Sequence, residues 1–347
     1  MDLRPALTAT LVCALAAAAL AGATAEAAPT RSAAKADQRD QGRAAAGVHR
    51  VGGCQVFPAD NPWNTRIDDK PMAKRSKAII RKQAAGHKIH LDLGTTEEYY
   101  GIPVNVVSKN HGTLPLKFGV EGEDYRRESD RGPVPTPKKA HIEGGSRAHP
   151  DPSGGDRHVI TVRRGTCKLV ELYKAKRVRN SAGKVVAWRA SAAARWDLGS
   201  NKLRPKFWTS ADAAGLPILP GLLDYDEAAS GEITHALRFT LPSARAAFVS
   251  PARHCGPSGN TSPTLPSYGM RFRLDANFPV KRYHGAARTI VVAMKRYGLM
   301  YADQGSAMYV TGSADPRWAK VLDQFNAHPI DGSRFEVVKT GKITRCR

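Results

Sequence analysis

One stretch decides how the rest of the chain is interpreted: residues 207–240, with the sequence FWTSADAAGLPILPGLLDYDEAASGEITHALRFT. It joins a segment rich in Gly and Pro to the run EITHALRFT, residues 232–240, in which apolar and polar residues alternate. A period of two is typical of a strand with one face buried. The same stretch holds carboxylates, a histidine and an arginine, more polar chemistry than a hydrophobic core needs. We therefore expect it to carry both a strand and a candidate site.

The composition around this stretch predicts a folded, mainly β protein. The 347 residues are 41% hydrophobic, which is enough to bury a core. The 23 prolines and 31 glycines separate short apolar runs, a pattern that favours many strands and turns over long helices. We expect two packed antiparallel sheets in a jelly-roll-like β-sandwich, with one or two short helices. Residues 71–85 and 289–297 have helical spacing of their apolar residues.

The first 50 residues fall into two segments of different composition. Residues 1–27 combine Arg4, an apolar Ala/Leu run and an A-x-A sequence, the features of a secretory signal peptide. Residues 28–50 are basic and Ala-rich without apolar periodicity, which predicts a disordered linker. We expect a single β-sandwich-type domain over residues 51–347. The apolar run is too short for a good membrane span, so we predict a secreted, extracellular protein that is either free or associated with the cell wall.

Export changes the interpretation of the cysteines. Without the signal peptide four remain, an even number in an oxidising compartment: Cys54, Cys167, Cys255 and Cys346. No two have C-x-x-C spacing, so two disulfides are favoured over a zinc or thioredoxin-like site. Three connectivities are open, and of these we expect Cys54–Cys346, which would tie the two ends of the folded part together.

The charge of the chain narrows the choice of partner. It has 53 Lys and Arg against 31 Asp and Glu, a formal net charge of +22 spread along its length. This charge suits adhesion to an anionic cell wall and also binding of an acidic polysaccharide. No nucleic-acid-binding motif occurs, which disfavours nucleic acid as a partner. We expect a monomer that binds a polysaccharide or a cell-wall glycan.

Several catalytic classes lack their motif in this sequence. It has no G-x-S-x-G nucleophile elbow, no H-E-x-x-H run, and no P-loop or dinucleotide fingerprint. These absences disfavour serine hydrolases, metalloproteases of the H-E-x-x-H type and nucleotide-dependent enzymes.

The acidic residues of the central stretch have several alternative roles. Asp224, Asp226 and Glu227 are candidate oxygen ligands of Ca²⁺, the one cofactor that the sequence suggests. A pair of carboxylates can also hydrolyse a glycosidic bond, and Asp226 with Asp303 is the pair that we expect. The structural alternative is a solvated turn at the start of a helix. Asp212 is a further candidate; its spacing after Thr209 also fits a helix-capping box.

Histidines and arginines in the predicted strands complete the candidate site. His158 and His235 share the apolar face of their strands, which favours buried structural histidines over catalytic ones. Arg271 and Arg273 form the polar face of the run GMRFRLDANF, the best single pointer to a binding face. The full set comprises the catalytic candidates His158, Asp212, Asp226, His235, His254 and Asp303, and the substrate-binding candidates Arg157, Trp208, Arg238, Arg271 and Arg273.

The order of motifs resembles a family of uncharacterised secreted proteins, mostly of actinobacteria. The matching runs include GDRH (155–158), WTSADAAGLP (208–217), YDE (225–227), HALRFT (235–240), PARH (251–254) and ADQGS (302–306). Together the matching runs reach from about Cys54 to Val338. The chain departs from the pattern at Gln304, where we would expect Asn, and at Asp275, where we would expect Lys. The resemblance implies no activity, because none is established for the family.

Two functions fit these residues. The first is an enzyme on extracellular polysaccharide, either a hydrolase or a lyase in which an arginine neutralises a uronate while a histidine or tyrosine removes the neighbouring proton. The lyase candidates are His158, His235, His254, Tyr225 and Arg271. The second function is a non-catalytic module that binds a wall glycan through exposed tryptophans. A cleft in which His, Arg and Asp converge would favour the enzyme, to which we lean, and an aromatic platform would favour the module.

Overall fold

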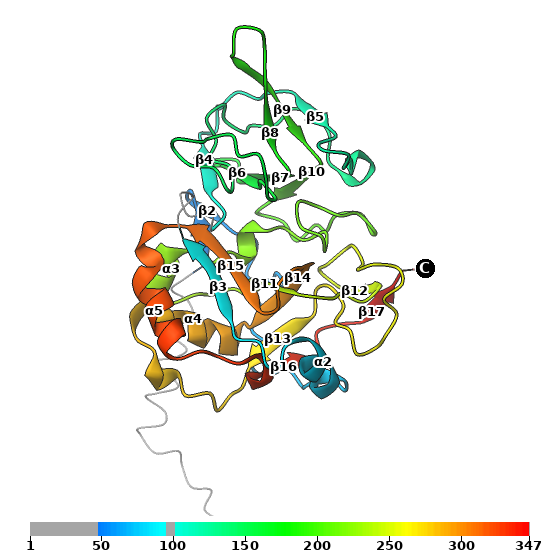
Figure 1. The fold of residues 1–347 in the computed structure, drawn as a ribbon, viewed down its shortest axis with the longest axis vertical. Helices are drawn as coiled ribbons and strands as arrows, with labels where there is room; N and C mark the ends of the chain where they lie inside the picture. The colour runs from blue at the N-terminus through cyan, green and yellow to red at the C-terminus, as the bar shows by residue number, and fades with distance from the viewer. Residues whose placement is uncertain (1–47, 95–100, 347) are drawn as a thin grey trace, which may run out of the picture. The chain divides into compact units, whose positions relative to one another are not determined.

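A mixed six-stranded sheet contains the C-terminal end of the central stretch, residues 237–240. The computed structural model describes residues 48–94 and 101–346, so the predicted signal peptide and most of the predicted linker lie outside the described residues. The strand order is β16-β13-β14-β11-β15-β3 (Figure 1). The strands are β3 (His90–Gly94), β11 (Leu237–Leu241), β13 (Arg271–Leu274), β14 (Leu299–Gln304), β15 (Tyr309–Ala314) and β16 (Phe335–Val338).

Two further sheets come from the first half of the chain. The four-stranded sheet has the order β10-β7-β6-β4 and the three-stranded sheet the order β5-β9-β8. Their strands are β4 (Val104–Val107), β5 (Leu116–Phe118), β6 (Val159–Arg163), β7 (Lys168–Tyr173), β8 (Lys176–Arg179), β9 (Val185–Ala190) and β10 (Ala192–Asp197). Two short ribbons pair β1 (Arg50–Val51) with β2 (Cys54–Gln55) and β12 (Ala247–Val249) with β17 (Ile343–Arg345).

The mainly β class is confirmed, whereas the purely antiparallel pairing is wrong. Four strand pairs are parallel: β11 with β14, β15 with β3, β4 with β6, and β5 with β9. A parallel pair needs a long crossover connection, and between β11 and β14 that connection includes the helix α4. Side-chain alternation gives the faces of a strand but not the direction of its neighbour, so the sequence could not predict the mixed pairing. The jelly-roll-like sandwich stays a prediction.

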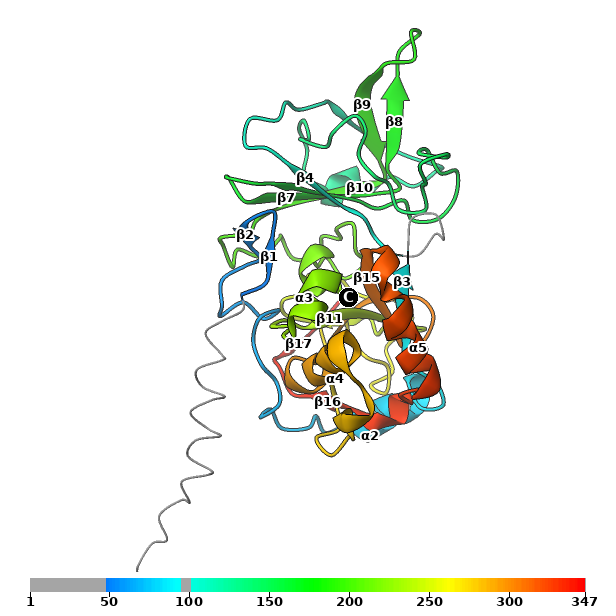
Figure 2. The same cartoon turned by 90° about the vertical axis from the view of Figure 1, so that its left-hand side faces the viewer.

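The described residues form four α-helices, more than the one or two expected. They are α2 (Ser76–Gln83), α3 (Tyr225–Ser230), α4 (Gly285–Arg296) and α5 (Ala319–Ala327). Helices α3, α4 and α5 lie together on one side of the six-stranded sheet (Figure 2). The amphipathic spacing predicted α2 and α4 near their observed positions. Helix α3 has only six residues, too few for a periodic pattern to be recognised.

The first half of the central stretch lies between the four-stranded and the six-stranded sheets. On one side the Glu171 carboxylate of β7 accepts hydrogen bonds from the Ile218 and Leu219 amides, at 2.9–3.0 Å. On the other side the Ala214 amide donates to Ala302 O of β14 at 3.1 Å. The backbone amides of the stretch therefore join the two sheets, through a side-chain carboxylate on one side and a backbone carbonyl on the other.

All four cysteines are paired, but not as expected. The disulfides are Cys54–Cys167 and Cys255–Cys346, so the predicted Cys54–Cys346 bond is wrong. The physical reason is local: β2 lies beside the β6–β7 turn that contains Cys167, and β17 returns to pair with β12, close to Cys255. Each end of the folded part is thus fastened to a neighbouring loop instead of to the other end.

Within the described ranges, no helix is both long enough and apolar enough to cross a membrane.

Candidate functional site

A pocket of about 1070 Å³ is lined by residues from both larger sheets and from the central stretch. Its polar lining includes three carboxylates and three tyrosines, together with His254, Arg345 and several uncharged polar residues; the carboxylates and tyrosines are Tyr125, Asp156, Tyr173, Asp212, Tyr268 and Asp303. The disulfide Cys255–Cys346 forms part of the wall. This pocket is the candidate functional site.

Arg238 of β11 organises the floor of the pocket. Its Nε donates to Asp212 Oδ2 at 2.6 Å, its Nη2 to Asp303 Oδ2 at 3.1 Å, and its Nη1 to Thr311 Oγ1 at 2.7 Å. Because Nε and Nη2 belong to the same edge of the guanidinium, both carboxylates face one edge of Arg238. Burial would lower the pKa of Arg238, but the charges of Asp212 and Asp303 outweigh it, so the guanidinium stays protonated.

Asp303 is the member of this triad whose side chain is most exposed to the pocket. A quarter of its side chain is exposed (25%), against 6% for Arg238 and none for Asp212. It lies opposite Thr240, where the register of β11 and β14 shifts, and such irregularities redirect side chains next to functional sites. Burial and the nearby charge of Asp212 raise the pKa of Asp303 to about 7. A carboxyl group in this position can therefore hold a proton at neutral pH.

Asp212 has a different role from the predicted helix cap. Residues 209–215 form turns, not a helix, so the capping interpretation is wrong. Thr209 Oγ1 instead donates to the Asp212 carbonyl at 3.3 Å, and the Asp212 carboxylate also accepts from the Ala214 amide at 3.1 Å. Burial raises the pKa of Asp212, against the opposing effect of Arg238. The side chain holds Arg238 and the turn in place.

His158 is buried, in agreement with the apolar face on which the sequence places it. Its Nδ1 donates to Glu143 Oε2 at 2.6 Å and its Nε2 to Ala211 O at 3.0 Å. Burial alone would lower its pKa, but the charge and hydrogen bond of Glu143 raise it to about 9. An imidazolium with both N–H groups engaged is a poor proton acceptor. Its contact with Ala211 positions the turn that carries Asp212.

Three of the predicted substrate-binding arginines bind other parts of the protein. Arg157 pairs with Glu121 at 2.8 Å, and Arg271 donates to the carbonyl oxygens of Pro62, Thr65 and Tyr297. Arg273 binds Glu336 and carbonyl oxygens between residues 67 and 70. None of these arginines lines the pocket. They fasten loops to the sheets, a use of arginine that the alternation pattern does not distinguish from groove lining.

The other candidates are distributed over several places. His254 lines the pocket, and its Nδ1 bonds Ala213 O at 3.0 Å. Trp208 is half-buried next to Arg204, and it does not line the pocket. Asp226 is exposed and accepts from Arg317 at 2.7 Å, so it is not near Asp303 in a shared site.

The predicted calcium ligands do not converge. Asp224 caps α3 by accepting from the Glu227 amide at 3.1 Å, Asp226 reaches Arg317, and Glu227 accepts from His235 at 2.9 Å. The helix begins at this point, and successive residues of a helix point in different directions. The calcium site is therefore not formed by Asp224, Asp226 and Glu227.

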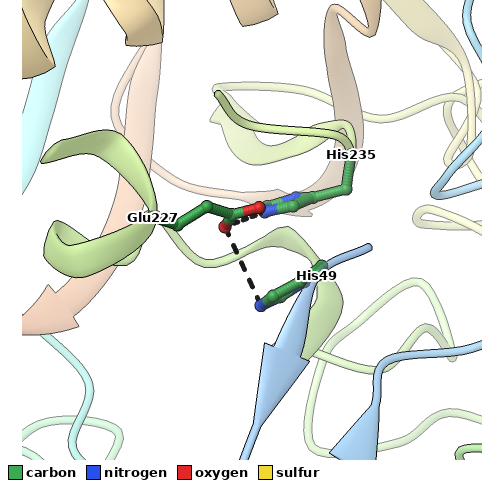
Figure 3. Close-up of side chains that lie close together, drawn as sticks. All are labelled: His49, Glu227 and His235. Carbon is green, nitrogen blue, oxygen red and sulfur yellow. Dashed lines mark hydrogen bonds and ion pairs between the residues drawn. The ribbon is translucent and has the colours of Figure 1, made fainter. Parts of the chain in front are cut away.

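A second polar cluster contains His235 and lies outside the pocket. His235 and Glu227 are joined there by His49, a residue at the end of the predicted linker (Figure 3). The His49 and His235 rings stack with centroids 4.2 Å apart. His235 is fully buried with Nδ1 bonded to a backbone carbonyl, as expected, while its Nε2 is bonded to Glu227. Burial lowers the pKa of His49 to about 3.

Sequence reasoning missed several residues of the pocket region, among them Glu171, Asp156, Tyr173 and Tyr268. Glu171 of β7 is a carboxylate within the apolar run LVELY, a detectable signal of a buried polar role, and burial raises its pKa to about 7. Asp156 lies within the GDRH motif beside residues that were considered. Tyr173 and Tyr268 carry no such signal, because tyrosine is common in ordinary strands.

Comparison with protein-family models, with curated proteins and with solved structures finds no match to this chain.

Proposed function

We propose that the protein is a secreted glycoside hydrolase that cleaves an extracellular polysaccharide in the Asp303 pocket. The observation that carries the proposal is an accessible carboxyl group whose pKa is raised to about 7, in a wide pocket that contains a second, exposed carboxylate. Glycosidases use such a pair, one carboxyl group as acid and the other as base or nucleophile.

Asp303 has the properties of the general acid. At neutral pH and below it carries a proton that it can give to the leaving glycosidic oxygen. Arg238 and Asp212 hold its carboxyl group in one orientation from behind. This support leaves the exposed quarter of the side chain to face the substrate.

Asp156 is the second carboxylate of the proposed pair. It is exposed, it lies in the loop before β6, and it lines the same pocket as Asp303. Tyr173 lines the same pocket; burial raises the pKa of its phenol, and the charges of Asp156 and Asp303 add to the rise. In the proposed reaction Asp156 activates water or attacks the anomeric carbon.

The pocket walls suit a sugar chain. Tyr125 is 40% exposed and Tyr173 is half-buried, so both rings offer a face or an edge to the pocket. Aromatic rings with a polar tip can stack on the apolar face of a sugar and bond its hydroxyl groups.

The lyase mechanism has less support. It needs an accessible cation to neutralise a uronate; Arg238 is almost fully buried and already engaged by two carboxylates, which leaves the exposed Arg345 of the pocket wall as the candidate for that role. Three aspartates line the pocket, Asp156, Asp212 and Asp303, and they make the reacting centre acidic. Hydrolysis of a bond between sugars is therefore favoured over removal of a proton next to a uronate.

A separate basic groove supports an anionic polymer as the substrate. This groove has a volume of about 730 Å³ and an apolar floor that includes Ile142 and Val185. Its rim carries exposed cations for which the described residues provide no acidic partner: Lys138, Lys139, Arg147 and Lys184. The loop over residues 141–156 contributes to both the groove and the pocket. The groove would hold a distant, charged part of the chain that is cleaved in the pocket.

The same groove supports the second candidate function, a glycan-binding module without activity. One experiment separates the two: purified protein is incubated with a panel of acidic and neutral polysaccharides, and both reducing ends and bound polymer are measured. New reducing ends without ultraviolet-absorbing unsaturated products support the hydrolase. Unsaturated products would support the lyase, and binding without any cleavage would support the module.

A further inference from the structure

Outside the pocket, His49, Glu227 and His235 place three ligand atoms close together. These atoms lie within 4.8 Å of one another, and no other group of three or more His, Cys, Asp or Glu side chains in the described part of the chain does so. We infer that His49, Glu227 and His235 bind one divalent transition-metal ion of the zinc type. This inference is independent of the proposed hydrolase.

The donor set selects the kind of metal ion. Two imidazole nitrogens and one carboxylate oxygen are ligands typical of Zn²⁺. Ca²⁺ and Mg²⁺ prefer sites built mostly from oxygen atoms, of which this cluster offers one carboxylate. The ion bound here is therefore neither of these hard cations.

The hydrogen bonds of His235 prepare it as a ligand. Its Nδ1 donates to Ala236 O at 2.8 Å, which fixes the tautomer and turns Nε2 toward Glu227 (Figure 3). Metal-binding histidines commonly donate their second N–H to a backbone carbonyl in this way. The proton now shared between Nε2 and Glu227 Oε2, which are 2.9 Å apart, leaves to solvent when the ion binds.

His49 provides an independent observation, because it is buried and lacks hydrogen-bond partners. The residue is only 5% exposed, and its Nδ1 has no partner within the described residues. Its Nε2 lies 3.9 Å from Glu227 Oε2, beyond hydrogen-bond distance. Buried polar groups are nearly always satisfied by protein, water or an ion. A metal ion between His49 and Glu227 supplies a partner for Nε2, while Nδ1 keeps its position without a hydrogen-bond partner in the described residues.

Binding of the metal ion needs one small movement, a tilt of the His49 ring. The two rings are stacked with an interplanar angle of 19°, so their planes are nearly parallel and do not point toward one shared position (Figure 3). The His49 ring must tilt toward Glu227 to direct its lone pair to a shared ion. His49 immediately precedes the two-residue strand β1, at the edge of the fold, so the tilt leaves the main core intact. The ion then fastens this N-terminal segment to α3 and to the start of β11.

The test is a titration of the purified full chain with Zn²⁺ after treatment with a chelator. We expect one Zn²⁺ per chain, and visible absorption bands when Co²⁺ replaces Zn²⁺. His49→Phe keeps a stacked ring but removes the ligand atom, so it should fold and bind Zn²⁺ at least ~10-fold more weakly. Glu227→Gln should weaken binding in the same direction.

The control is His87→Ala, which removes an exposed histidine outside the cluster and should bind Zn²⁺ as the unmodified chain does. The thermal midpoint in chelator shows whether each variant is folded. Failure of the unmodified chain to bind a stoichiometric ion would overturn the site. Equal Zn²⁺ affinity of folded His49→Phe and the unmodified chain would overturn it as well.

Discussion

Asp212 and Asp303 bind the same guanidinium edge, yet they differ in what they can do. The Asp212 side chain is inaccessible to solvent, whereas Asp303 retains an exposed quarter in a wide pocket. Buried ion pairs of this kind are often structural, so burial alone would not identify an active site. The combination of raised pKa and access supports the proposal that Asp303 is the group that reacts.

The protonation of Asp303 predicts the pH dependence of the reaction. Its pKa is raised to about 7, so the acid form that donates the proton is lost as the pH rises through that value. We expect kcat/KM for polysaccharide cleavage to fall about tenfold for each pH unit above 7. A pH series from 5 to 9 checks this; a rate that stays constant between pH 6 and 8.5 would contradict the role of Asp303 as acid.

Removal of the Arg238 charge should strongly destabilise the folded protein. Arg238→Met leaves Asp212 buried without its cation, which we expect to lower the free energy of unfolding by about 3–5 kcal/mol. Denaturant unfolding measures the change. The double variant Arg238→Met, Asp212→Asn removes the uncompensated charge and should recover part of the loss. Unfolding of Arg238→Met at the same denaturant concentration as the exposed control Arg282→Met would show that the contacts of Arg238 with Asp212 and Asp303 do not stabilise the fold.

At the scale of elements, the period-two pattern predicted where a strand would form but not its full extent. EITHALRFT predicts a strand over residues 232–240, whereas β11 covers Leu237–Leu241. The residues before it turn toward Glu227 and His49, because His235 makes side-chain bonds there. Such tertiary contacts decide where a strand begins, and they leave no trace in the periodicity.

The hydrogen bonds that Glu171 of β7 accepts from the central stretch give a prediction at this scale. Glu171→Ala leaves the buried amides of Ile218 and Leu219 without an acceptor, so we expect a loss of about 2–3 kcal/mol in unfolding free energy. Glu171→Gln keeps one carbonyl oxygen and should cost less. Chemical denaturation of both variants checks the order. Equal stability of Glu171→Ala and the unmodified protein would mean that these amides find other partners.

At the scale of the whole molecule, the pocket depends on segments far apart in the chain. Asp156 precedes β6, Asp303 belongs to β14, and the C-terminal disulfide closes one wall. The sequence could identify Asp212, Arg238 and Asp303 as candidates, because Asp212 lies in the polar part of the central stretch, Arg238 on the polar face of an alternating run and Asp303 in the short polar run ADQGS. It could not predict that Asp156 joins them, or that Arg271 and Asp226 do not, because those placements depend on strand order and disulfide connectivity.

The two disulfides should have different effects on function. They close loops of similar length, with separations of 113 and 91 residues, so removing either should cost about 4 kcal/mol of stability. Only Cys255–Cys346 lines the pocket. We therefore expect Cys255→Ala, Cys346→Ala to lose activity even below its melting temperature, whereas Cys54→Ala, Cys167→Ala keeps its activity when folded. Equal activity of the two folded variants would contradict this assignment.

The most direct test of the account is the initial rate of reducing-end release by Asp303→Asn, compared with the unmodified protein and with Asp323→Asn, an exposed control on α5. We expect Asp303→Asn to lose at least ~100-fold in rate while it still binds the polymer and unfolds at a similar temperature. Asp323→Asn should cleave normally. A folded Asp303→Asn protein that cleaves at the unmodified rate would contradict the central claim that Asp303 is the catalytic acid.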